Sequence, residues 1–256
     1  MFEILQDITM QIQNIPGFIA IILGYLIAMA VFVFVVNPLH NYVKYFLAYK
    51  FGDFRLCGDG LVSMSFANSF HWIGVFSALV MKMGFALPVN YNRDRLKHPI
   101  GNIIVISLSG ILVYFLFSLA VLFLYALVKT FNIYDIGAVG TPPVDAPLGA
   151  YVYHTIYSTV NFLTKICFCS AVVNIIPLVP MDMGDVLYMF INTRYTDFLR
   201  NNHMLISAAL FVVLFFTLGK TGSYMSVLCS ISNSPILVPI LQFYYWIING
   251  VGAIFA

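Results

Sequence analysis

Three ionisable side chains lie in or beside apolar segments where a charge is unexpected: His40, Lys44 and Asp182. His40 and Lys44 are four residues apart in a helical pattern, so their side chains share one face of that helix. Asp182 lies far along the chain from His40 and Lys44 and follows another apolar segment. Pro177 and Pro180 interrupt the helical pattern just before it. An i, i+4 pair on a helix with a remote carboxylate is an arrangement that can hold a catalytic metal ion. Such intramembrane charges indicate a functional site.

The composition of the chain shows which solvent surrounds it. Of 256 residues, 61% are hydrophobic and only 9% are charged, and the mean hydropathy is +0.94. This is too little charge to coat a water-soluble monomer, so the sequence predicts an integral membrane protein. The 12 Lys and Arg residues are scattered rather than gathered in stripes, which excludes a nucleic-acid partner. The four cysteines carry no framework pattern and are interpreted as buried free thiols.

Six apolar runs define the expected elements. They cover residues 17–36, 72–89, 101–127, 151–178, 203–218 and 235–256. They predict an all-α membrane protein, a polytopic helical bundle of about five to six membrane segments, forming a single integral membrane domain over residues 1–256. The run at 72–89 is interrupted by Lys82, Gly84 and Pro88, so it either spans or re-enters, and we favour the re-entrant interpretation.

The distribution of basic residues predicts the orientation. Basic residues follow the first long helix and gather at 92–98 and 193–202, which places these loops in the cytoplasm. The N-terminal residues carry Glu3 and Asp7 and no Lys or Arg, so the N-terminus is expected outside and the first apolar run is expected to be retained. If both ends of the run at 72–89 lie on the cytoplasmic side, the run must re-enter rather than cross, or pair with a second short stretch between Gly58 and Phe70, and we favour re-entry.

Five motifs, taken in order, resemble the site-2 protease family of intramembrane zinc metalloproteases, and in particular its compact bacterial members. His40 stands where the first zinc histidine belongs, and residues 48–53 (AYKFGD) match the end of that helix. Residues 85–99 (FALPVNYNRDRLKHP) and 107–110 (SLSG) resemble the family's loop and next core helix. Asn174, Pro177, Pro180 and Asp182 keep the spacing of the motif that carries the third zinc ligand. The resemblance implies a site-2 protease-like core and a bacterial plasma (inner) membrane location.

The departures from that family fall on the chemistry. Asn41 stands at the position of the general-base glutamate, and an amide has no proton-accepting equilibrium near neutral pH. Lys44 replaces the second zinc histidine, and an ammonium has no lone pair for a metal. His40 and Asp182 would then be the only retained ligands, whereas catalytic zinc takes three protein ligands and a water. We therefore expect a degenerate metal site, no catalytic residue and no bound cofactor.

Two more positions mark a degenerate substrate groove. Tyr114 takes the place of an asparagine that contacts the substrate backbone in active relatives, and Ile111 replaces a proline three residues before it. Asn174 is retained in the aspartate motif, but Met183 and Asp185 depart from the residues that follow it in the family.

The charges themselves indicate what replaces the metal. In a core of low dielectric constant, an unpaired lysine or aspartate would be neutral or strongly destabilising. We therefore expect the Lys44 ammonium to occupy roughly the space of the zinc ion and to bond Asp182, with a neutral His40 beside them. The alternative is that Lys44 extends to the cytoplasmic interface, since it lies only eight residues before Gly52.

These observations favour a non-catalytic, pseudoprotease-like integral membrane protein that acts as a subunit, scaffold or binding protein. Its expected partners are membrane lipid and other integral membrane proteins within a hetero-oligomeric complex. One alternative is a zinc metalloprotease whose site is rebuilt from His40, Asp182 and a displaced histidine such as His71, with zinc as its cofactor. A second is a small transporter that uses Lys44, Lys165 and Asp182.

Overall fold

The computed structural model describes residues 15–130, 142, 146–178, 180–187, 189–190, 198 and 201–219, and every regular element within these ranges is helical. Three helices there are long and apolar enough to cross a membrane: Ile15–Lys50, Pro99–Tyr125 and Leu148–Val173. An all-α fold compatible with a membrane is thus confirmed. The expected count of five to six segments stays a prediction, and the apolar run at 235–256 lies outside the described residues.

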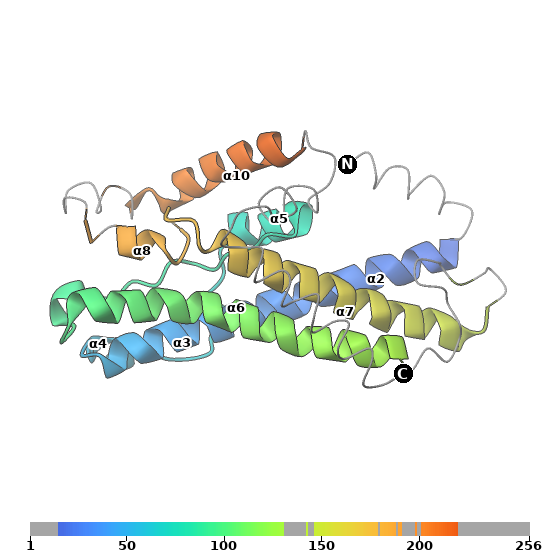
Figure 1. Cartoon of the computed structure of the whole chain (residues 1–256), viewed down its shortest axis with the longest axis horizontal. Helices are drawn as coiled ribbons and strands as arrows, with labels where there is room; N and C mark the ends of the chain where they lie inside the picture. Colours follow the sequence, from blue (N-terminus) through green and yellow to red (C-terminus); the bar gives the residue numbers. More distant parts are fainter. Residues whose placement is uncertain are drawn as a thin grey trace. The chain divides into compact units, whose positions relative to one another are not determined.

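The elements follow one another along the chain with few regular structures between the long helices (Figure 1). They are α2 (Ile15–Val31), η1 (Phe32–Val36), α3 (Asn37–Lys50), α4 (Arg55–Gly58), α5 (Trp72–Met81), η2 (Arg93–Arg95), α6 (Pro99–Thr130), α7 (Leu148–Val173), α8 (Gly184–Leu187) and α10 (His203–Gly219). The chain divides into two compact units by the contacts among its residues, and α2, α6, α7 and α10 contribute to both.

A π-helical turn joins α2 to α3 without a break. In this turn, η1, the Asn37 N–H donates to the carbonyl of Phe32, five residues earlier. Pro38 lacks an N–H and its ring would collide with a carbonyl in a regular α-helix, so the wider turn accommodates it. This π turn sets the direction in which α3 presents His40.

One unit contains the N-terminal part of α2, the end of α6 and the first two thirds of α7. The rings of Tyr25 and Phe162 lie 4.9 Å apart, edge to face. The hydroxyl groups of Tyr125 and Tyr157 lie 2.8 Å apart. α7 therefore contacts both α2 and α6 within this unit.

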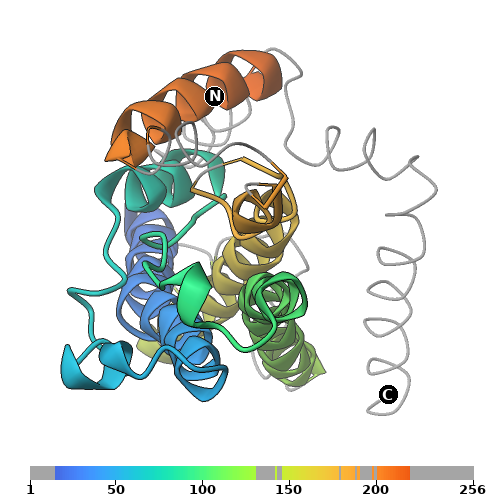
Figure 2. The same ribbon diagram turned by 90° about the vertical axis from the view of Figure 1, so that its left-hand side faces the viewer.

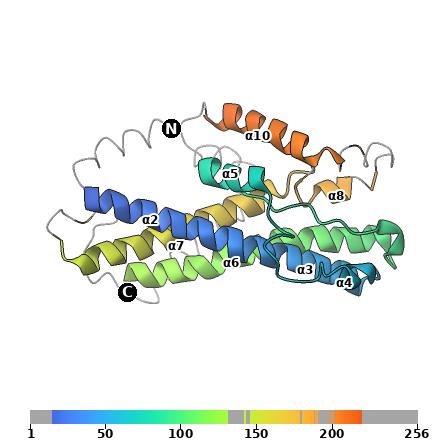
Figure 3. The same ribbon diagram turned by 180° about the vertical axis from the view of Figure 1, so that it is seen from behind.

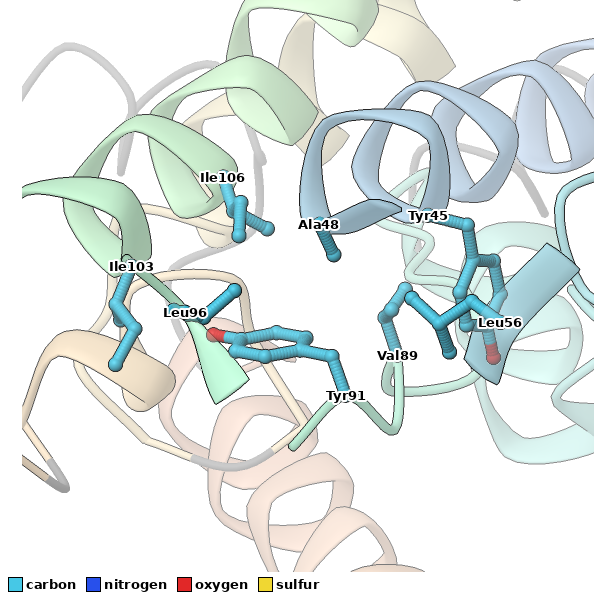
Figure 4. Packing of buried hydrophobic residues seen from close by; sticks show 8 residues of the cluster. All are labelled: Tyr45, Ala48, Leu56, Val89, Tyr91, Leu96, Ile103 and Ile106. Atoms are coloured by element: carbon cyan, nitrogen blue, oxygen red, sulfur yellow. The ribbon is translucent and has the colours of Figure 1, made fainter. Parts of the chain in front are cut away.

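The other unit covers residues 29–118 and 165–212 and holds every sequence-predicted site residue. Its hydrophobic core joins α3, α4, the start of α6 and the segment that leads into η2 (Figure 4). The core residues are Tyr45, Ala48, Leu56, Val89, Tyr91, Leu96, Ile103 and Ile106. Figure 3 shows α4 directly after α3, at the end of α3 that this core covers. The packing fixes α3 against α6, and these two helices carry most of the site.

The segment at 72–89 doubles back on itself. Its helix, α5, has only ten residues, or about 15 Å, which is too short to cross a bilayer. The chain reverses at Lys82, which is in the left-handed conformation, and returns without regular structure. The Leu87 N–H then donates to the carbonyl of Ser69, on the entering side. Both ends of the segment thus lie together, and the re-entrant interpretation stays a prediction.

α10 lies along α5 within this unit (Figures 1 and 2). The rings of Phe76 and Phe211 lie 5.4 Å apart. On its other side, α5 touches the returning segment of the hairpin, which has no regular structure. The contact is so close that a Cβ on Gly74 would overlap the carbonyl oxygen of Phe85. The hairpin is therefore held between α10 and the chain around the site.

Candidate functional site: a buried ion cluster

Lys44 and Asp182 form a buried ion pair, as the sequence predicts. The Lys44 Nζ donates to Asp182 Oδ1 at 2.5 Å, and the two side chains are 3% and 2% exposed. The alternative in which Lys44 reaches the cytoplasmic interface is wrong, because its ammonium turns inward onto the carboxylate. His40 Nε2 contacts the other oxygen, Asp182 Oδ2, at 2.8 Å. One carboxylate thus joins both residues of the i, i+4 pair on α3.

The turn after α7 is built to present Asp182. Asn174 follows the last residue of α7, and its Nδ2 donates to the carbonyl of Ser170 at 2.7 Å. Its backbone carbonyl accepts from Met183 N–H at 3.2 Å, and its Oδ1 lies 3.4 Å from the Asp182 N–H. Asn174, predicted as a groove residue, therefore positions the carboxylate from within the protein.

The helix α6 approaches the ion pair at Gly110. A Cβ at this position would lie 2.6 Å from His40 Nε2 and would overlap Asp182 Oδ2. Only a residue without a side chain allows this approach. Gly110 ends the SLSG motif at residues 107–110. This motif thus places backbone directly against the His40–Asp182 contact.

Tyr114 fills the space beside His40. Its side chain is fully buried, and its ring stacks on the His40 ring with 4.5 Å between the centroids. Its hydroxyl donates to Asn37 Oδ1 at 2.9 Å. The group that stands at a substrate-contact position in the resembled family therefore makes its hydrogen bond inside the protein.

Asn41 ties the two ends of the hairpin at residues 72–89 to α3. Its Nδ2 donates to the carbonyl of Asn68 at 2.8 Å and to the carbonyl of Leu87 at 3.0 Å. A glutamate carboxylate would present oxygen to these two carbonyl oxygens and could not donate when ionised. The amide at the general-base position thus has a structural role that the sequence did not reveal, because its partners are backbone atoms.

Asn41 also orients the His40 ring. Since Asn41 Nδ2 faces two carbonyls, Oδ1 is the atom that lies 2.9 Å from His40 Nδ1, and this oxygen can only accept, so Nδ1 donates to it. The other ring nitrogen, Nε2, contacts Asp182 Oδ2.

The two neighbours of Asp182 stabilise its charged form. Burial by itself raises the pKa of Asp182, but His40 and Lys44 more than offset this effect and lower it to about 2. Asp185, which also accepts from the Tyr91 hydroxyl at 3.3 Å, interacts electrostatically with Lys44.

A cavity of about 620 Å³ opens beside Lys44. The returning hairpin segment, residues 87–90, forms one wall, and Asp185, Asn201 and His203 contribute polar groups. Lys44 lines the cavity, and so does Leu87, whose carbonyl accepts the hydrogen bond from Asn41. The cluster is therefore sealed on the side of α6 and adjoins an open cavity on the side of the hairpin.

His71 does not join the cluster. Its Nδ1 accepts from the Gly74 N–H and caps α5, and its ring lies 5.3 Å from Phe85 and 5.7 Å from His203. Burial, and to a smaller extent His203, lower the pKa of His71 to about 4, so this ring is neutral at physiological pH. Among the described residues, no three His, Cys, Asp or Glu side chains are grouped as a metal ion would require.

Comparison of the chain with protein-family models, curated proteins and solved structures finds no match.

Removing one partner of the ion pair should cost more than removing both. Lys44→Ala leaves an uncompensated carboxylate in the core and should lower the free energy of unfolding by about 3–5 kcal/mol. The double variant Lys44→Met with Asp182→Leu replaces both charges by apolar groups and should lose less. Thermal melts in detergent compare the two, and equal losses would mean that the pair contributes nothing.

Asn41→Asp changes the donor amide to a carboxylate of the same shape. It removes two hydrogen bonds to carbonyls and should destabilise the protein by about 2–3 kcal/mol. Asn201→Asp makes the same chemical change at an exposed position and serves as the control in the same melting assay. A similar small shift in both variants would contradict the role of Asn41 in holding the hairpin.

Proposed function

We propose that this chain is a non-catalytic, site-2 protease-like integral membrane protein that binds membrane partners as a subunit, scaffold or binding protein. The observation that carries the proposal is the contact of the Lys44 ammonium with the Asp182 carboxylate. In the resembled family these two positions supply zinc ligands. Here one of them is a cation, and a cation repels a metal ion rather than binding it.

The second support comes from the position of the general base. A metalloprotease needs a carboxylate that takes a proton from the zinc-bound water. Asn41 cannot do this, and its amide protons are already bonded to the carbonyls of Asn68 and Leu87. Water activation at this site therefore lacks both the metal and the base.

The third support concerns binding. Tyr114 closes the space beside His40, whereas the cavity of about 620 Å³ next to Lys44 stays open. A site of this size with a polar floor can hold a segment of another chain. Loss of the catalytic groups together with retention of a cavity favours a protein that binds membrane proteins over an enzyme.

The proposal includes a topology. The chain would have five to six membrane segments, with 72–89 re-entrant, the N-terminus outside and the basic loops in the cytoplasm of a bacterium. In this orientation the end of α3 at Lys50 and the loop at 92–98 face the cytoplasm. Partners would then meet the chain within the plasma membrane or at these loops.

Metal analysis of the purified chain tests the proposal. After gentle solubilisation we expect zinc well below one equivalent and no peptidase activity, together with a membrane protein that co-purifies in a fixed ratio. One equivalent of zinc that is lost on His40→Ala would overturn the proposal in favour of the rebuilt metalloprotease. Solute flux in liposomes that vanishes on Asp182→Asn would overturn it in favour of the transporter.

A further inference from the structure

Two exposed arginines share one buried carboxylate just after the end of α3. Asp53 is fully buried, and its Oδ2 accepts a hydrogen bond from the Asn92 N–H at 2.8 Å. Arg55 Nη2 lies 3.7 Å from Asp53 Oδ2, and Arg95 Nη1 lies 3.9 Å from Asp53 Oδ1. The carboxylate thus brings together one guanidinium group from α4 and one from η2.

The backbone around the two arginines is fixed. The Lys97 N–H donates to the carbonyl of Phe51 at 3.0 Å, which joins the end of α3 to the segment between η2 and α6. A leucine of the hydrophobic core directly follows each arginine, and Figure 4 shows these leucines, Leu56 and Leu96, among the other core side chains. A ligand that binds the arginines therefore requires little reordering of the chain.

The guanidinium groups keep donors for a ligand. The side chains of Arg55 and Arg95 are 42% and 53% exposed. Their distances to Asp53, and the 3.7 Å between Arg55 Nε and Asp59 Oδ2, are longer than a hydrogen bond. Neither guanidinium group donates a hydrogen bond to another residue that the structure describes. A guanidinium group binds a phosphate through two parallel N–H donors, so the two arginines together suit one phosphate.

The outer face of α3 changes from apolar to charged at Lys50. The lysine before it, Lys44, is buried, whereas Phe46 is exposed. The order is reversed at α6, because Lys97 is exposed just before this helix and Ile100 is 65% exposed in its first turn. Both helices belong to the apolar lengths that can cross a membrane. The hydrocarbon therefore begins close to both lysines, and the arginines between them lie at the level of the lipid phosphates.

This surface offers both an excess of positive charge and apolar contact. Among residues 50–59 and 92–98, the exposed Lys, Arg and Asp residues are four cations and two anions: Lys50, Arg55, Arg95 and Lys97, and Asp59 and Asp94. Such an excess attracts anions. Phe46 and Ile100 expose apolar side chains on the hydrocarbon side of these charges. A phospholipid can use both features, whereas a free phosphate can use only the charges.

We propose that Arg55 and Arg95 bind the phosphate of an anionic phospholipid such as phosphatidylglycerol, while its acyl chains lie against the end of α3 and the start of α6. Charge complementarity selects an anionic lipid over a zwitterionic one. Asp53 positions the guanidinium groups and does not contact the lipid, because it is fully buried. The inference goes beyond the proposed function, since it requires a chain that lies in a membrane but neither the absence of zinc nor a protein partner.

Lipid retention by the purified chain tests this site. The full chain is solubilised in detergent that contains equal amounts of phosphatidylglycerol and phosphatidylcholine with the same acyl chains. Native mass spectrometry then compares how much of each lipid stays bound. We expect about tenfold more phosphatidylglycerol than phosphatidylcholine, and inorganic phosphate in the buffer should not displace it.

Two double variants separate the arginine site from general surface charge. Arg55→Lys with Arg95→Lys keeps both charges beside Asp53 but removes the guanidinium groups, so the preference should fall to about twofold. Lys50→Gln with Lys97→Gln removes two charges from the same surface but leaves the arginines, so most of the preference should remain. Asp53 keeps two cations beside it in both variants, so both should fold with melting temperatures close to that of the unchanged chain.

Any of four results would overturn the proposal. They are equal retention of the two lipids, a preference that survives the two Arg→Lys changes, equal losses of preference in the two double variants, and displacement by inorganic phosphate, which would assign the arginines to a free phosphate. The zinc measurement uses other residues and another readout. A positive zinc result would therefore overturn the proposed function while the lipid preference is judged separately.

Discussion

The rest of the site depends on the hydrogen bonds that the Asp182 carboxylate makes with Lys44 and His40. Its two oxygens bind Lys44 and His40, which come from the same face of α3, while Asp182 itself arrives from the turn after α7. Because all three groups are buried, none of them tolerates the loss of its partner. This explains why α6 approaches at a glycine and why Asn174 holds the turn with backbone hydrogen bonds.

The sequence was sufficient for the ion pair and insufficient for its surroundings. Lys44 and Asp182 could be paired because opposite charges in an apolar bundle have few alternatives. The role of Asn41 could not be predicted, since its acceptors are carbonyls at residues 68 and 87 that carry no sequence signal. His71, the displaced histidine of the rebuilt-site alternative, likewise lies away from His40, because tertiary packing places its ring against His203. The left-handed Lys82 was visible only as an interruption of an apolar run.

The most direct measurement is whether one substitution at Lys44 creates a zinc site. Lys44→His supplies the third ligand beside His40 and Asp182 and leaves Asn41 to hold the hairpin. We expect the purified variant to bind one equivalent of zinc, and to lose it on Asp182→Ala, while Lys44→Met binds none. A Lys44→His variant that is as free of zinc as the unchanged chain would contradict the claim that Lys44 occupies the place of the metal.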